Sequence, residues 1–218
     1  MATGKTTLYL KQMEVGPMAN FAYLVGSAET REVAVVDPGW EAEKILKAAE
    51  QDGMAITKVL ITHTHFDHVH ALPELLEKVN AKVYVHKLEA EFLKGLGSDL
   101  VKVEGGDEIG IGDVSIQFLH TPGHTPGSQC FLVRGRLISG DTLFIGSCGR
   151  CDLPGGDPAE MYRSLMKLKE LDDQVILYPG HNYARKPFST LGDEKRSNPF
   201  LQLTSLSAFL QTMGFPIS

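Results

Sequence analysis

Four short apolar segments of this chain each end in a turn that carries histidine or aspartate. Such segments are typical of buried strands, and loops at the ends of a rigid sheet often carry functional side chains. The segments are residues 58–62, 110–119, 136–139 and 175–178. The turns that follow them contain His63-Thr64-His65-Phe66-Asp67-His68, His124, Asp141 and His181. We therefore expect a fold in which these strand ends meet along one edge and bring the turns together.

The periodicity of the rest of the chain predicts two blocks of strands with helices attached. Further strands are expected at residues 7–15, 21–26 and 32–36, as an antiparallel meander, and at 82–85 and 129–133. Arg134-Gly135 is expected to form a tight hairpin turn. Helices are expected at residues 41–51, 69–79, 88–93 and 158–171. This order predicts an α/β (α+β) fold, an αββα sandwich of two sheets covered by helices.

The 218 residues contain no low-complexity segment or linker that would divide the chain, so we expect a single domain over residues 1–218. The formal net charge is −6 and no run of basic residues is present, which argues against a nucleic-acid partner. No apolar stretch approaches the roughly 18–20 residues of a membrane span, and the N-terminus does not resemble a secretion signal. We therefore expect a cytoplasmic protein with no membrane partner.

The three cysteines are too few for a disulfide framework, which fits a reducing compartment. Two of them form the C-x-x-C sequence Cys148–Cys151 within a Gly- and Pro-rich stretch. Redox motifs of this kind lie at a helix start early in a βαβ unit. We therefore favour an ordinary loop over a redox function for this pair.

The histidine-dense turn at residues 63–68 indicates a metal site. Neutral imidazoles and carboxylates are the ligands of Zn²⁺ and similar first-row metals, and catalytic sites complete their ligand set from distant parts of the chain. The alternative is a solvated turn with histidines present by chance. Only eight histidines occur in the chain, and three of them fall in this window, so we favour the metal site.

The four motifs H-x-H-x-D-H, G-H-T, G-D-T and P-G-H together resemble those of the metallo-β-lactamase superfamily. The resemblance runs from Asp37-Pro38-Gly39 to Asn198-Pro199-Phe200 and so covers most of the chain. Residues 121–127, 140–150 and 180–183 are most similar to the glyoxalase II (hydroxyacylglutathione hydrolase) and persulfide dioxygenase branches. The expected fold is therefore the metallo-β-lactamase fold, with a short C-terminal extension after about residue 185.

This resemblance implies two divalent metal ions held by seven side chains. His63, His65 and His124 would bind one metal, Asp67, His68 and His181 the second, and Asp141 would bridge them. We expect Zn first, with Fe or Mn also compatible with these ligands. The resemblance implies attack by a metal-bridging hydroxide, so no catalytic protein nucleophile is expected, and no G-x-S-x-G elbow is present.

Four further residues of metal-ligating type are not expected to bind a metal. His70, His86 and His120 have no matching role in the family motifs and are left out. Asp37 is expected to organise its Pro-Gly turn and to fix a ligand histidine rather than to bind a metal.

The glyoxalase II branch implies a hydrolase that cleaves a glutathione thioester, a small-molecule substrate. By resemblance, Arg150 and Tyr183 would bind the glutathione part. The alternatives are a surface arginine and a packed core tyrosine. The oligomeric state stays open.

Two departures favour an alternative reaction. Glyoxalase II enzymes carry a longer helical C-terminal extension, and Cys151-Asp152-Leu153 stands where they have an aromatic residue. The alternative is a persulfide dioxygenase acting on glutathione persulfide, with one Fe(II) held by His63, His124 and Asp141. A metal-binding scaffold without activity is disfavoured, because a structural metal needs only four ligands.

Overall fold

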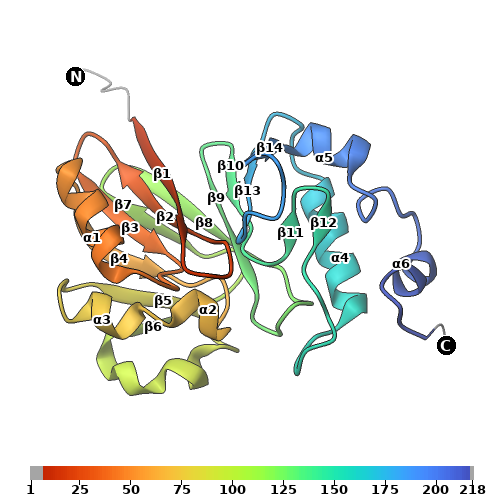
Figure 1. The fold of residues 1–218 in the computed structure, drawn as a ribbon, viewed down its shortest axis with the longest axis horizontal. Helices are drawn as coiled ribbons and strands as arrows, with labels where there is room; N and C mark the ends of the chain where they lie inside the picture. The colour runs from red at the N-terminus through yellow and green to blue at the C-terminus, as the bar shows by residue number, and fades with distance from the viewer. Residues whose placement is uncertain (1–6, 217–218) are drawn as a thin grey trace.

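The computed structural model describes residues 7–216, and it contains two six-stranded mixed sheets packed between two sets of helices (Figure 1). The first sheet has the order β1-β2-β3-β4-β5-β6. Its strands are β1 Leu8–Val15, β2 Asn20–Ser27, β3 Glu32–Val36, β4 Ala55–Leu60, β5 Lys82–His86 and β6 Leu100–Val103. Strands β1 to β3 form an antiparallel meander, and β3 to β6 run parallel to one another.

The second sheet has the order β14-β13-β10-β9-β8-β7. Its strands are β7 Glu108–Ile111, β8 Val114–His120, β9 Gln129–Val133, β10 Arg136–Ile138, β13 Ile176–Tyr178 and β14 Ser189–Thr190. Only β10 and β13 are parallel neighbours. A separate hairpin joins β11 Leu143–Phe144 to β12 Ser147–Cys148.

The helices cover the two outer faces. On the first sheet lie α1 Ala42–Gln51, α2 Phe66–Val69, α3 Leu72–Leu76 and the 3₁₀ helix η1 Ala90–Asp99. On the second lie α4 Pro158–Lys169 and α5 Leu191–Ser197, and α6 Leu206–Thr212 packs against α4 (Figure 1). Helix α4 shows why these segments are helical. Asp157 caps its first turn by accepting hydrogen bonds from two backbone N–H groups, and Pro158 occupies a first-turn position that needs no N–H donor.

Three apolar layers follow from this arrangement. Between the sheets, Tyr23 and Leu60 of the first sheet pack in one cluster with Phe118 and Phe131 of the second. A second cluster joins the outer face of the first sheet to α1 and α3, and a third joins the outer face of the second sheet to α4, α5 and α6. The expected αββα sandwich of two sheets flanked by helices is confirmed.

Three of the predicted elements were wrong in detail. The helix expected at residues 69–79 is two short helices, because Pro73 starts a new helix at α3. The helix expected at 88–93 is the 3₁₀ helix η1, which Leu93 and Gly97 interrupt with non-helical backbone. The strand expected at 110–119 is a hairpin that turns at Gly112, where φ is +56°. Strand β6 was not predicted.

Candidate metal centre

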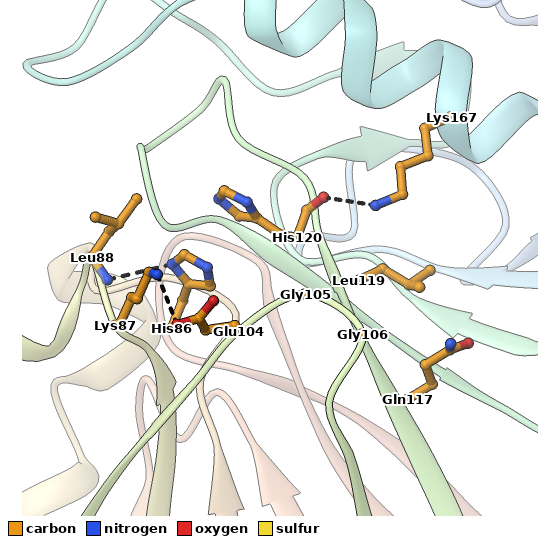
Figure 2. A pocket seen from close by; sticks show the side chains of 10 residues that line it. All are labelled: His86, Lys87, Leu88, Glu104, Gly105, Gly106, Gln117, Leu119, His120 and Lys167. Atoms are coloured by element: carbon orange, nitrogen blue, oxygen red, sulfur yellow. Dashed lines mark hydrogen bonds and ion pairs between the residues drawn. The ribbon is translucent and has the colours of Figure 1, made fainter.

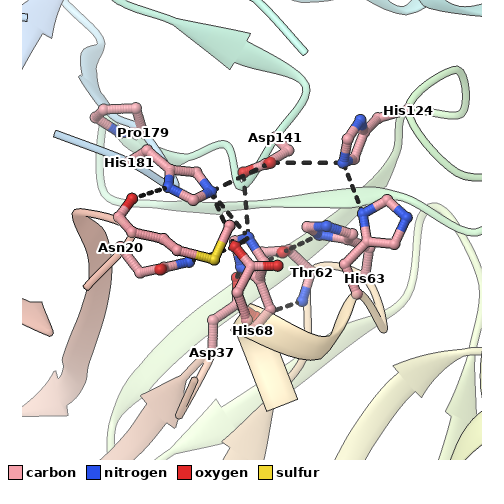
Figure 3. Close-up of polar contacts among 12 residues, drawn as sticks. Asn20, Asp37, Thr62, His63, His68, His124, Asp141, Pro179 and His181 are labelled. Carbon is pink, nitrogen blue, oxygen red and sulfur yellow. Dashed lines mark hydrogen bonds and ion pairs between the residues drawn. The ribbon is translucent and has the colours of Figure 1, made fainter. Parts of the chain in front are cut away.

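The candidate ligands follow the carboxyl ends of strands from both sheets: Asp67 and His68 lie in the short helix α2, and the other five lie in turns or loops (Figure 3). The turn at residues 63–68 follows β4, which pairs with β3 in parallel, and Asp37 follows β3. Asp141 follows β10 and His181 follows its parallel neighbour β13. His124 lies between β8 and β9. The sandwich therefore brings together the turns that the sequence pattern singled out.

His63, His65 and His124 form the first group. One ring nitrogen of each lies within 4.8 Å of the others. Nδ1 of His65 is 2.9 Å from Nε2 of His124, and the rings of His63 and His65 are nearly perpendicular at 86°. The three ring nitrogens are therefore close enough together for one cation to bind all of them.

Asp67, His68 and His181 form the second group, again within 4.8 Å. Nε2 of His68 lies 3.3 Å from Nε2 of His181. The Oδ2 atom of Asp67 lies 3.6 Å from Nε2 of His68 and 3.4 Å from Nε2 of His181.

Asp141 lies between the two groups. Its Oδ2 atom is 3.5 Å from Nε2 of His124 in the first group and 3.4 Å from Nε2 of His181 in the second. Its Oδ1 atom is 3.4 Å from Nε2 of His68. A carboxylate in this position can neutralise charge in both groups, which is the placement required of a bridging ligand.

The outward-facing ring nitrogens of four histidines are held by the protein. Nδ1 of His63 lies 3.1 Å from the Thr62 hydroxyl, that of His68 lies 2.9 Å from Asp37, that of His124 lies 2.7 Å from the Arg150 carbonyl, and that of His181 lies 3.0 Å from the Met18 carbonyl. Partners of this kind fix the ring orientation and leave Nε2 with a free lone pair for a metal.

One carboxylate oxygen of Asp37 also lies within 4.8 Å of a ring nitrogen of His63 and of a ring nitrogen of His68. Both of its oxygens are engaged, however, because Oδ1 accepts from the Thr62 backbone N–H at 2.7 Å and Oδ2 from the Thr62 hydroxyl at 2.5 Å. The expectation that Asp37 supports a ligand histidine instead of binding a metal agrees with these contacts.

Asn20 plays a similar role for Asp67 and was not predicted. Its side-chain amide donates to Oδ2 of Asp67 at 2.8 Å and accepts from the Trp40 indole at 3.1 Å. A lone asparagine at a strand start carries no sequence signal for this function.

The chemistry of the two groups fits bound cations. Nε2 of His63 and Oδ1 of Asp141 are buried and make no hydrogen bond to any residue in the described range 7–216. Buried polar atoms normally have hydrogen-bond partners, so these two atoms indicate that a partner is missing from the site. A metal ion would satisfy both.

Burial and neighbouring side chains favour the ligating protonation state at His63 and at Asp141, whereas, against the effect of burial, Asp141 raises the pKa of His68 and of His181 above the ordinary value. Burial, reinforced by His68, lowers the pKa of His63 well below its ordinary value. Burial alone would raise the pKa of Asp141, but the adjacent His68 and His181 hold it well below its ordinary value. The His63 imidazole and the Asp141 carboxylate therefore both present lone pairs to a metal, since a neutral imidazole and an ionised carboxylate are the ligating forms.

Glu89, which lies between β5 and η1, links two of the ligand loops and was missed by the sequence reasoning. It is 2% exposed. Its Oε2 atom accepts from both the backbone N–H (3.1 Å) and the hydroxyl of Thr64, and Oε1 accepts from the Gly127 N–H at 3.0 Å. Thr64 separates two ligand histidines, and Gly127 follows His124 by three residues. Glu89 therefore ties together the two loops of the first group.

The side chains of the two predicted substrate-binding residues, Tyr183 and Arg150, differ in whether they border the candidate metal centre. Tyr183 is 63% exposed, so the core alternative is wrong, and its ring stacks on that of His181 at 4.7 Å and 12°. Arg150 contacts the site through its carbonyl, while its exposed guanidinium makes two bonds of 2.6 and 2.7 Å to Asp152. The tyrosine side chain thus borders the centre, whereas the arginine side chain is paired elsewhere.

The three histidines left out of the site lie outside both groups. His70 packs against Trp40 and Phe66. His86 and His120 stack at 4.0 Å and 12° beside a separate hollow of about 620 Å³ that Lys167 also lines (Figure 2). Stacked parallel rings do not direct their nitrogens to a common point.

The C-x-x-C cysteines do not have the properties of a redox pair. Both thiols are free and buried. Burial, followed by the nearby Asp157, raises the pKa of Cys151 to about 12, and burial also raises that of Cys148. Reactive thiols need a lowered pKa, so the raised pKa values argue against a redox function. Cys148 ends the short strand β12, and Cys151 lies in the loop that follows it.

In the part of the chain that the structure describes, no helix is both long enough and apolar enough to cross a membrane.

Comparisons with known proteins agree with this geometry. The chain is 32% identical over 193 residues to the probable polyketide biosynthesis zinc-dependent hydrolase PksB of Bacillus subtilis, covering 88% of this chain and 86% of that protein. The crystal structure of ETHE1 from Myxococcus xanthus superposes with a TM-score of 0.86 at 31% identity, covering 94% of this chain and 90% of that one. The structure of TTHA1623 in a di-iron-bound form superposes with a TM-score of 0.77 at 37% identity, covering 88% and 100%.

Residues 15–181 match the sequence profile described as the metallo-beta-lactamase superfamily. The match spans more than half of the chain and includes all seven candidate ligands. The chain therefore belongs to the metallo-beta-lactamase superfamily.

Proposed function

We propose that this protein is a metal-dependent hydrolase that cleaves a glutathione thioester. The observation that carries the proposal is the position of Asp141, whose two oxygens lie 3.4 to 3.5 Å from histidines of both groups. That placement supports a site for two metals with seven protein ligands: His63, His65, His124, Asp67, His68, His181 and Asp141. The relative PksB is named as zinc-dependent and TTHA1623 was solved in a di-iron-bound form, and these names support zinc or iron as the metal, with manganese also compatible with the ligands.

The metals, the seven ligands and the supporting carboxylates would have different roles in the reaction. When bound, divalent metals of this kind polarise a carbonyl group and lower the pKa of water. The seven side chains fix the position of that chemistry, and the contacts of Asp37 and Glu89 hold the ligand loops in place. In the net reaction water adds to the thioester carbonyl carbon and the C–S bond breaks. The thiolate needs no strong acid to leave, since thiols ionise near a pKa of about 8.5.

We place the thiol part of this small-molecule substrate beside Tyr183. The exposed tyrosine ring stacks on His181 and meets Phe144 edge-on at 5.5 Å, so it offers a polar hydroxyl at the rim of the second group. Arg150 would contribute only if its guanidinium left Asp152, and we therefore assign it a secondary role in binding.

A persulfide dioxygenase is the second candidate, and one observation favours it. ETHE1, a persulfide dioxygenase, is a structural neighbour at a TM-score of 0.86 and 31% identity. That reaction would use one Fe(II) held by His63, His124 and Asp141. The second group would then support the first without holding a metal.

Elemental analysis of the purified protein, run beside two assays, separates the candidates. About two metals per chain with hydrolysis of S-lactoylglutathione would support the thioesterase. About one iron per chain with oxygen uptake on glutathione persulfide would support the dioxygenase. Replacing His124 with Ala should remove a metal and nearly all turnover in either case, so an active, fully metallated variant would refute both.

A further inference from the structure

A small apolar pocket opens directly against the first ligand group. Its volume is about 270 Å³, and its wall includes the ligand His65 together with Phe92, Pro126 and Pro154. Phe92 projects from η1 and is 75% exposed, the highest value among the exposed large hydrophobic side chains of the described residues. Ligand pockets are concave and mostly apolar with a few polar groups, and this pocket has that character directly beside a candidate metal ligand.

The polar groups in this wall are already paired within the protein. Both oxygens of Glu89 accept hydrogen bonds from Thr64 and Gly127, and the Thr64 hydroxyl is used in that contact. The Thr125 hydroxyl lies 2.8 Å from that of Ser128. Apart from His65, every polar side chain of the wall is therefore already hydrogen-bonded within the protein, which disfavours polar ligand groups that need partners.

The pocket and Tyr183 border different ligand groups. The pocket borders His65 of the first group, whereas Tyr183 stacks on His181 of the second, and Asp141 lies between the two groups. In a thioester whose carbonyl lies near Asp141, one of the two substituents of the thioester group would thus extend toward the pocket and the other toward Tyr183.

We infer that the pocket lined by Phe92, Pro126 and Pro154 binds the acyl arm of the thioester and selects medium-length apolar acyl groups. This inference rests on the proposed thioesterase function and adds the substrate class to it. The thiol arm then lies toward Tyr183. Each methylene that becomes fully buried should improve kcat/KM about three- to four-fold.

The test uses the full-length, metal-loaded protein and S-acetyl-, S-butanoyl- and S-hexanoylglutathione. We expect kcat/KM to rise with acyl length, and Phe92→Ala to lower the hexanoyl-to-acetyl ratio at least about five-fold. Phe188→Ala is the matched control, since Phe188 is also an exposed phenylalanine and does not line this pocket. It should leave the ratio unchanged.

Calorimetric binding of hexanoate and acetate to the same protein gives a readout without turnover. Hexanoate should bind at least about ten-fold more tightly than acetate, and Phe92→Ala should remove most of that preference. A hexanoate preference that depends on Phe92, without thioester hydrolysis, would refute the proposed reaction and keep the pocket. No dependence on chain length, or a dependence that Phe92→Ala leaves intact, would overturn the pocket assignment.

Discussion

Replacing Glu89 tests whether the ligand loops are held by one buried carboxylate. In Glu89→Gln the amide oxygen can keep the contacts to Thr64, but the NH₂ group must then face the Gly127 N–H, which loses its acceptor. An unsatisfied buried donor destabilises a protein by about 1–3 kcal/mol. We therefore expect Glu89→Gln to lower the free energy of unfolding by about 1–3 kcal/mol, and Glu89→Ala to lower it further.

The same change should weaken metal binding at the first group, because Thr64 and Gly127 belong to the loops of His63, His65 and His124. Loss of supporting contacts typically lowers metal affinity about 10–100-fold. Urea unfolding followed by fluorescence of the single tryptophan, with and without metal, measures the stability, and competition with a chelator measures the affinity.

Glu91→Gln is the control for this experiment. Glu91 forms an exposed ion pair with Lys94 at 2.6 Å, which contributes less than about 0.5 kcal/mol. If Glu89→Gln were as stable and bound metal as tightly as Glu91→Gln, the proposed link between the two loops would be refuted.

Three further predictions follow from other contacts. Asp37→Asn should weaken metal binding at the second group about 10–100-fold, because His68 loses its anionic partner; unchanged chelator competition would contradict this. Gly39→Ala should lower Tm clearly, because its Cβ would lie 1.8 Å from the Asp67 carbonyl oxygen; an unchanged melting curve would refute the clash. Burial and then His120 lower the pKa of His86 to about 4, so protonation opposes folding below about pH 6.5, and stability falls as the pH drops toward 4. Between pH 7 and pH 5, the free energy of unfolding of His86→Phe should therefore fall by about 1–2 kcal/mol less than that of the wild type, as measured by urea titrations. Equal decreases in the two proteins would show that His86 is not the cause of the pH dependence.

The fold was predictable where local pattern and topology agree. Apolar runs such as β4 are strongly patterned, and the ligand turn after β4 sits at the end of a strand that the sequence marks clearly. Arg134 and Gly135 both have positive φ, as the predicted tight turn requires. The convergence of the turns on one edge follows from the same pattern.

The rest depends on contacts between residues distant in sequence. Glu89 resembles any other glutamate near a helix start until the fold places it between Thr64 and Gly127. Strand β6 has only four residues, and its pairing with β5 is what defines it. The ion pair between Arg150 and Asp152 could not be predicted either, since the rotamer of an exposed side chain leaves no pattern in the sequence.

The most direct test of the central claim is an anomalous-scattering map from crystals of the metal-loaded protein. Our account predicts two peaks, one among His63, His65 and His124 and the other among Asp67, His68 and His181, with Asp141 in contact with both. A map with no peak at either group, or with peaks that Asp141 does not touch, would contradict it.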